Sequence, residues 1–226
     1  MQRSSNVVRP AGMRRNSGTF LLSFPARARV RLLRTANDSL TTRPTVCPVN
    51  PIEEYNSLTA LFPQPVPLVE QVDYIPAAST PEPYKSLLVH DKHMTVTMEQ
   101  YHGCPVDVQV IEKRLDHDVY SRKITLTKTG TDKVIQFGLV RFDFQYVDDQ
   151  VREEIVSESI PLGRVLINHN VLRHVDLNAI LKVPAGPGLA EYLQMTEGGV
   201  TYGRLATIFC DHKPAIDLLE VSAPLE

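Results

Sequence analysis

The stretch VYSRKITLT, residues 119 to 127, decides the fold class because its side chains alternate between two chemical kinds. Successive side chains of a β-strand point to opposite faces. One face of this strand is polar, and the other is largely apolar, carrying Tyr120, Arg122, Ile124 and Leu126. An unpaired guanidinium is costly to bury, so we expect Arg122 to meet either an acidic partner or an anionic ligand.

The same two-residue period extends on both sides of this strand. Before it, valines alternate with polar residues over 106–110, and after it residues 133–144 are apolar on both faces, as in a central strand. Strand character returns at 171–183, 200–210 and 214–223. Short turns join several of these strands, so the sequence predicts an α+β fold built on a single antiparallel sheet.

Three other segments carry helix signals. Apolar side chains repeat at three and four residues over 83–102 and stop before Gly103, which predicts one continuous helix. Segments 148–169 and 184–198 are predicted as helical insertions between strands. Two such insertions can close over one face of the sheet as lids.

A candidate anion receptor lies in the first of these insertions. The turn PLGR, residues 161–164, reopens a helix after a proline, so the backbone N–H groups of Leu162 and Gly163 can point at a carboxylate. Glu220 is a second candidate, because it shares a strand face with Ile216 and Leu218. Such a carboxylate is either paired with an arginine or tuned as a proton donor or acceptor.

Two interpretations of Arg122 and Glu220 remain open at this point. They can form an internal salt bridge with no further role, or line a cavity for a small anion beside the PLGR turn. His90 and His93 invite a metal interpretation. A zinc pair on a helix prefers a spacing of four and needs further ligands, so we predict solvated histidines and no metal site.

Composition and charge restrict the function classes. The 226 residues are 42% hydrophobic, and no run of eighteen apolar residues predicts a membrane span. Residues 1–44 hold nine Arg, no Lys and one acid, for a net charge of +8, whereas residues 45–226 hold 15 basic and 25 acidic residues, for −10. An acidic body argues against a nucleic-acid partner. We expect an Arg-rich tail at 1–44, a Pro-rich strap at 45–82 and one domain at 83–226.

The three cysteines, Cys47, Cys104 and Cys210, are odd in number and contain no CxxC pair. This spacing predicts buried thiols in a reducing compartment rather than a disulfide framework. We therefore expect a cytoplasmic protein.

Six ordered motifs between about Pro83 and Leu225 resemble the chorismate lyase family, in particular its branch of bacterial chorismate lyase-like proteins. They are LLVHDKHMT at 87–95, YSRKI at 120–124, QFGLVRF at 136–142, PLGRVL at 161–166, TYGRLATI at 201–208 and DLLEV at 217–221. The resemblance implies a single antiparallel sheet of about six strands, with helices on one side and two helical flaps over an internal pocket. It also implies a chorismate–pyruvate lyase that converts chorismate to 4-hydroxybenzoate and pyruvate, as in ubiquinone biosynthesis, without metal or organic cofactor. We expect a monomer whose partner is chorismate.

The resemblance also implies roles for five residues. Arg122 would grip a substrate carboxylate, and Glu220 would act near the 4-position oxygen, which makes these two the catalytic candidates. The backbone N–H of Leu162 would bind the ring carboxylate beside Gly163, and Met94 would line the pocket.

Alternatives of other classes stay open. Tyr202 stands where the well-studied short enzymes have a tryptophan, and those enzymes lack the long N-terminal extension. The same fold serves as the effector-sensing half of certain bacterial transcription regulators, which makes a non-catalytic domain that binds small aromatic acids the main alternative. The winged-helix DNA reader of such regulators does not fit residues 1–82, which are too broken by proline. A related lyase or a degenerate paralogue acting on another aromatic precursor is the third. Retention of Arg122 and Glu220 favours an enzyme.

Overall fold

The structure is a computed structural model that describes residues 50–69 and 71–225. The predicted tail at 1–44 and the beginning of the predicted strap lie outside the described residues. All described residues belong to one unit, Val46–Glu226.

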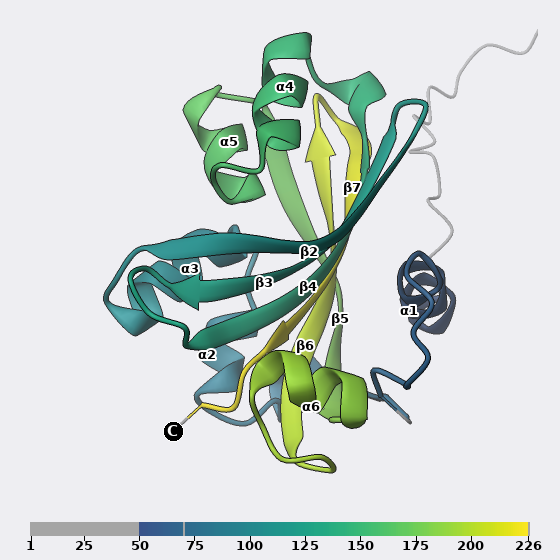
Figure 1. Cartoon of the computed structure of the whole chain (residues 1–226), viewed down its shortest axis with the longest axis vertical. Coiled ribbons are helices and arrows are strands. Elements are labelled where there is room, and N and C mark those ends of the chain that lie inside the picture. Colours follow the sequence, from purple (N-terminus) through teal and green to yellow (C-terminus); the bar gives the residue numbers. More distant parts are fainter. Residues whose placement is uncertain (1–49, 70, 226) are drawn as a thin grey trace, which may run out of the picture. The chain divides into compact units, whose positions relative to one another are not determined.

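In this part of the chain seven strands form one sheet, in which every neighbouring pair is antiparallel (Figure 1). The strand order is β1-β5-β6-β7-β4-β3-β2. The predicted α+β class with a single antiparallel sheet is confirmed, with one strand more than the six expected, because the strap contributes β1. The strands are β1 Asp73–Ile75, β2 Val106–Asp116, β3 Val119–Lys128, β4 Val134–Asp143, β5 Arg173–Pro184, β6 Val200–Cys210 and β7 Lys213–Ser222.

The helices of the described chain lie on both faces of the sheet, whereas the resemblance implied helices on one. Helices α1 and α6 pack with Phe137 and Leu139 of β4 on one face, and α2 to α5 cover the other. A strand that is apolar on both faces, as β4 is, needs cover on both. The helices are α1 Pro51–Ala60, α2 Tyr84–Leu88, α3 Met94–His102, α4 Asp149–Ser157, α5 Leu162–Asn168 and α6 Pro187–Leu193, with 3₁₀ turns at Ala77–Ser79 and Phe144–Tyr146.

The two segments predicted as lids, 148–169 and 184–198, therefore cover opposite faces of the sheet and not the same one. Segment 148–169 forms α4 and α5 above the face that carries Arg122, but α6, from segment 184–198, packs on the opposite face. Its Tyr192 ring stacks on Phe137, with ring centroids 5.2 Å apart. The sequence showed that both segments interrupt the strands, but not which face each one covers. None of the helices in the described ranges has the length and apolarity needed to cross a membrane.

The polar face of β3 is buried rather than solvated. Lys123 is 3% exposed, with its Nζ 5.7 Å from the ring centroid of Phe62 and 5.5 Å from that of Tyr192. The same Nζ lies 3.1 Å from an oxygen of Glu112. Two aromatic rings and one carboxylate thus compensate for removing this cation from water.

The predicted helix over 83–102 is two helices. It breaks at residues 89–93, between α2 and α3, where His90 Nε2 lies 2.6 Å from the carbonyl oxygen of Leu87. At this break, backbone carbonyl groups of the loop face the sheet, where Arg204 of β6 donates hydrogen bonds to them.

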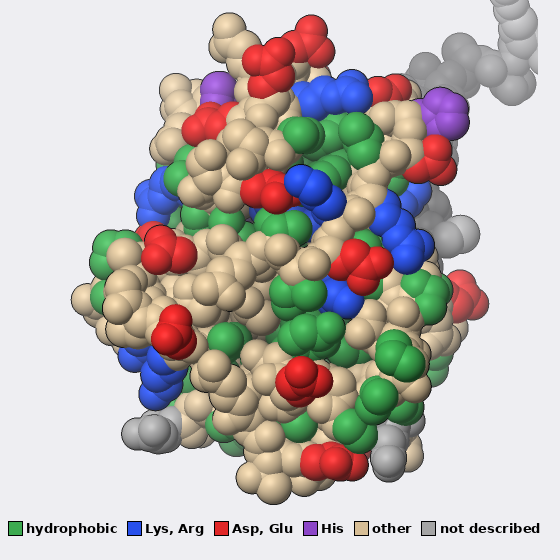
Figure 2. Space-filling view, in the orientation of Figure 1, with side chains coloured by type: hydrophobic (Ala, Val, Ile, Leu, Met, Phe, Trp, Pro, Cys, Tyr) green, Lys and Arg blue, Asp and Glu red, His purple; other side chains and the backbone are tan. Residues whose placement is uncertain are grey.

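Positive and negative side chains are interspersed with apolar ones on the face that Figure 2 presents. Neighbouring charges of opposite sign weaken one another's field, so this face does not concentrate potential of one sign.

Candidate functional site

The five residues singled out from the sequence all line one internal cavity of about 40 Å³. Arg122 and Glu220 come from the sheet, Met94 from the start of α3, and Leu162 and Gly163 from the start of α5. The apolar part of the lining includes Ile124, Leu126, Val140, Ile208 and Leu218. The structure thus brings the candidates together, and their individual roles stay predictions.

The strand register arranges the floor of the cavity in rows across the sheet. In the first row Arg122 lies opposite Val140. In the second row Gly138 lies opposite Glu220, which in turn lies opposite Arg204. In the third row Leu126 lies opposite Gln136. Side chains two residues apart on a strand share a face, so the three rows point into the same cavity.

Arg122 is buried without a hydrogen-bond partner. Its side chain is 1% exposed, and none of its three guanidinium nitrogens has a partner among the described residues. Burial lowers its pKa from the ordinary value, whereas the nearby Tyr120 and Glu158 oppose that shift. The Tyr120 hydroxyl donates to Glu158 at 2.9 Å. Tyr120 also has a polar interaction with the guanidinium, whose nitrogens nevertheless have no partner at hydrogen-bond geometry among the described residues.

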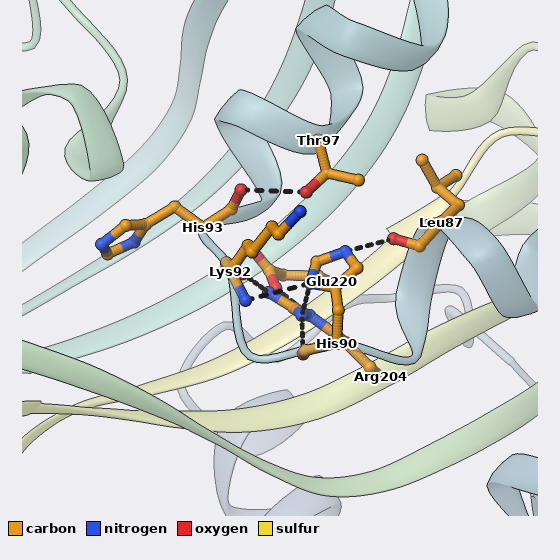
Figure 3. Close-up of polar contacts among 7 residues, drawn as sticks. All are labelled: Leu87, His90, Lys92, His93, Thr97, Arg204 and Glu220. Carbon is orange, nitrogen blue, oxygen red and sulfur yellow. Dashed lines mark hydrogen bonds and ion pairs between the residues drawn. The ribbon is translucent and has the colours of Figure 1, made fainter.

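Glu220 is paired with Arg204 and not with Arg122. Arg204 Nε donates to Glu220 Oε2 over 2.7 Å (Figure 3). The other guanidinium nitrogens donate to the backbone carbonyl oxygens of His90 and Lys92, each over 3.1 Å. This arrangement excludes the internal Arg122–Glu220 salt bridge that the sequence left open. One arginine is satisfied by the protein, and the other faces the cavity unpaired.

Arg204 is the functional residue that sequence reasoning missed, although the same signal marks it. The alternating positions of β6 carry Val200, Tyr202, Arg204, Ala206 and Ile208, so this arginine also stands on a largely apolar face. The pattern that identified Arg122 on β3 therefore applies equally to Arg204.

The histidines predicted to be solvated are partly buried and hydrogen-bonded. Arg173 Nε donates to His93 Nε2 over 2.7 Å, and the His93 ring points away from the Arg204–Glu220 pair (Figure 3). Burial, with the nearby positive charges of Arg173 and Arg204, lowers the pKa of His93 to about 4. No cluster of three or more His, Cys, Asp or Glu residues within the described ranges could hold a metal ion.

Helix α5 covers the cavity at close range. The Pro161 carbonyl accepts from the N–H groups of Arg164 and Val165, so those of Leu162 and Gly163 precede the first intrahelical bonds. A Cβ added at Gly163 would lie 3.2 Å from the Cβ of His93 and 3.2 Å from Oγ1 of Thr95. Glycine is thus what allows α5 to approach the start of α3 so closely.

Helices α4 and α5 form the cover of the cavity, and partly exposed ion pairs connect them to each other and to neighbouring elements. Arg164 of α5 is paired with Glu99 of α3, and His169, which follows α5, is paired with Glu154 of α4. At the end of α4, Glu158 lies 2.7 Å from Lys113 Nζ. Ligand pockets commonly enclose roughly 300–1,000 Å³. The cavity of about 40 Å³ is smaller than this range.

No protein-family model matches the sequence, and no curated protein matches it. Solved structures with similar architecture exist. The ligand-binding domain of a transcriptional regulator assigned to the GntR family in Bordetella bronchiseptica has a TM-score of 0.41 and 12% identity, over 52% of this chain and 85% of that one. A GntR-family transcriptional regulator from Enterococcus faecalis has a TM-score of 0.39 and 14% identity, over 53% and 99%. The C-terminal domain of the histidine utilization repressor from Pseudomonas syringae has a TM-score of 0.39 and 10% identity, over 54% and 96%.

The prediction of a chorismate–pyruvate lyase is contradicted by this comparison, because the solved structures named above are transcriptional regulators or domains of them. Every TM-score is below 0.5, so the likeness is one of general architecture, and membership of the chorismate lyase family is not confirmed. The catalytic role predicted for Glu220 stays a prediction. Its carboxylate is engaged by Arg204 and forms part of the cavity wall.

Proposed function

We propose that the described domain binds a small aromatic carboxylic acid without transforming it, as an effector-sensing domain does. The observation that supports this proposal is the state of Arg122. A fully buried guanidinium with three unpartnered nitrogens is unfavourable unless an anion joins it. A carboxylate is the anion that matches the forked geometry of a guanidinium with two parallel hydrogen bonds.

The rest of the cavity favours an organic acid over an inorganic anion. Its walls include Met94, Ile124, Val140 and Leu218, whose side chains offer apolar contact to a ring. The N–H groups at the start of α5 lie on the cover side, where they can add hydrogen bonds to the same carboxylate.

The experiment that tests this proposal is a calorimetric titration of the full-length chain with benzoate and with its neutral analogue benzamide. We expect saturable binding of benzoate and weaker binding of benzamide. Charge-assisted hydrogen bonds contribute about 1.5–3 kcal/mol, so Arg122→Met should weaken benzoate binding about 10- to 100-fold. Chromatography after incubation should recover the acid unchanged.

A matched control is Arg141→Met, which removes an exposed arginine from β4 on the opposite face, where it is paired with Asp217. This variant should bind benzoate as the parent does. Equal benzoate affinity in the parent and in Arg122→Met would contradict the proposal. The absence of saturable benzoate binding to the parent would contradict it as well.

A further inference from the structure

A separate cavity, of about 310 Å³, lies on the face of the sheet that α1 covers. On the strands it is lined by Thr207 and Asp217, each next in sequence to Ile208 or Leu218 of the Arg122 cavity. Successive side chains of a strand point to opposite faces, so the sheet separates the two cavities. The volume lies at the lower end of the range for small-molecule sites. This α1 cavity is also lined by Glu53, Glu54, Ser57, Leu58, Arg141 and Asn178.

Glu54 of α1 is buried with half of its carboxylate unsatisfied. The residue is 8% exposed, and Asn178 Nδ2 donates to its Oε1 over 2.8 Å. Its Oε2 has no hydrogen-bond partner in the described part of the chain. The first turn of a helix favours acidic residues, but an exposed one such as Glu53 meets that preference without any desolvation cost. The needs of α1 therefore do not account for a buried glutamate at this position.

Asn178 holds the Glu54 carboxylate against the sheet and has no further hydrogen to give it. Asn178 is the extra residue of a bulge in β5, where the pairing with β6 shifts between Leu177 and Ala179. A bulge re-aims the side chain of the strand that carries it. The two hydrogens of the Asn178 amide are used by Glu54 and by Thr207, whose Oγ1 lies 2.9 Å from the same nitrogen. Oε2 therefore needs a donor from another source.

The charge around the α1 cavity is negative. Arg141 is the only cation among the described residues of the lining, and it is paired with Asp217 over 3.3 Å. One positive charge thus faces three negative ones, a net charge of −2 when Glu53, Glu54 and Asp217 are all ionised. Burial raises the pKa of Glu54, the hydrogen bond from Asn178 lowers it, and the charge of Asp217 raises it. A cation in the cavity would offset both the burial of this carboxylate and the repulsion between the two acids.

We propose that the α1 cavity binds a small organic ammonium ion, with Glu54 Oε2 as the anchor. An ammonium group is a compact charge with three hydrogens, which suits one free oxygen. A guanidinium fork prefers a carboxylate with both oxygens free, and Asn178 already occupies one of them. Leu58 offers apolar contact to a short aliphatic chain, so the ligand class is a primary alkylamine. This site goes beyond the carboxylate site of the proposed function and does not depend on it.

The test is a calorimetric titration of the full-length chain at neutral pH with butylamine, which is then protonated, and with the neutral 1-butanol. We expect saturable binding of butylamine and none of 1-butanol. Glu54→Gln keeps the shape of the side chain and an acceptor for Asn178, and should weaken butylamine binding about 10-fold or more, because the anchor loses its charge. Glu153→Gln, at an exposed position of α4 on the other face, is the matched control and should bind butylamine as the parent does.

A second variant fills the α1 cavity instead of removing its anchor. Ser57 is exposed and stands three residues after Glu54, so the two side chains are neighbours on α1. Ser57→Lys supplies a tethered ammonium group, which should compete with butylamine and lower its affinity about 10-fold or more. Thermal unfolding gives an independent measurement, since butylamine should raise the Tm of the parent but not that of Glu54→Gln or Ser57→Lys.

Three outcomes would overturn the inference. The first is the absence of saturable butylamine binding to the parent, and the second is 1-butanol binding of equal affinity, which would show that charge is not recognised. The third is an unchanged butylamine affinity in Ser57→Lys or in folded Glu54→Gln, which would place the amine elsewhere. None of these results bears on benzoate binding at Arg122, because that residue lies on the other face of the sheet.

Discussion

Arg204 and Glu220 lie opposite each other on β6 and β7, with Arg204 Nε 2.7 Å from Glu220 Oε2. The same guanidinium holds the carbonyl groups of His90 and Lys92, so it connects the sheet to the loop between α2 and α3. That loop leads into His93 and Met94, which line the cavity. One buried arginine therefore positions both an acidic wall residue and a segment of the opposite wall.

Removing Arg204 should strongly destabilise the protein. Arg204→Met leaves a buried carboxylate and two carbonyl groups without their donor, and breaking a buried ion pair on one side costs about 3–5 kcal/mol. Urea unfolding of the full-length chain measures this loss. The double variant Arg204→Met/Glu220→Met removes both charges and should recover more than half of it. A double variant as unstable as the single one would show that the bonds to the loop carbonyls, rather than the ion pair, dominate.

Removing Arg122 should have the opposite effect on stability. Arg122 is buried without a bonded partner, so Arg122→Met exchanges an uncompensated charge for an apolar chain and should raise the free energy of unfolding by about 1 kcal/mol or more. Arg141→Met at an exposed position should stay within about 0.5 kcal/mol of the parent. A substantial loss of stability in Arg122→Met would mean that the protein itself supplies a partner for this side chain.

Closing the contact between α5 and α3 requires glycine at residue 163. The added methyl of Gly163→Ala would meet His93 and Thr95 at 3.2 Å, and overpacking of this kind costs about 1–3 kcal/mol. Thermal unfolding should show a lower Tm for Gly163→Ala. Asn168→Ala, at the exposed end of the same helix, should leave the Tm nearly unchanged. An unchanged Tm in Gly163→Ala would indicate that the cover can shift freely.

Helix α5, which covers the cavity, should move away from it faster when its ion pair with α3 is removed. Glu99→Gln weakens the pair with Arg164, and both side chains are partly exposed, so the stability change should be below about 1 kcal/mol. Stopped-flow binding should show a faster association of benzoate if the ring enters the cavity of about 40 Å³ past α5. Glu191→Gln on α6, on the opposite face, should leave the rate unchanged. Equal rates in all three proteins would place the entrance elsewhere.

The stability of the protein should depend on the pH through His93. Its pKa in the folded protein is lowered from 6.5 to about 4, so the folded ring stays neutral where the unfolded ring takes up a proton. The unfolded state binds more protons in this range, so the contribution of His93 is full above about pH 6.5 and is lost as the pH falls toward 4. His93→Gln keeps an acceptor for Arg173 and cannot titrate. Urea unfolding across this range should give a shallower decline in His93→Gln than in the parent, whereas the exposed control His212→Gln should follow the parent.

The sequence predicted the parts of the site that depend on strand alternation. Arg122 and Glu220 stand out on apolar faces, and the structure places both on one cavity. The break between α2 and α3 could not be read in the same way, because residues 83–102 have a continuous helical period. The break is stabilised by Arg204, which lies more than one hundred residues further along the chain. Local pattern carries no information about such a distant donor.

The face of the sheet that each helix covers could not be predicted from the local sequence pattern either. An amphipathic segment shows that it must cover a sheet, but either face of a strand such as β4 is apolar enough to receive it. In the folded protein α6 packs in the same hydrophobic cluster as α1 and Phe137 of β4. Gln136 also escaped notice, because a single glutamine in a buried strand is not unusual until the absence of a partner in the described chain is seen.

Arg122 and Lys123 are consecutive cations of β3 that lie on opposite faces of the sheet, in different surroundings. Arg122 enters the cavity without a bonded partner, whereas Lys123 lies on the other face between two aromatic rings and a carboxylate. Inserting or deleting one residue in this strand would exchange the two, putting a lysine into the cavity and a guanidinium among the rings. A change in the length of β3 is therefore expected to disturb the cavity more than a change in its composition, since the face on which a side chain lies depends on whether its position is odd or even.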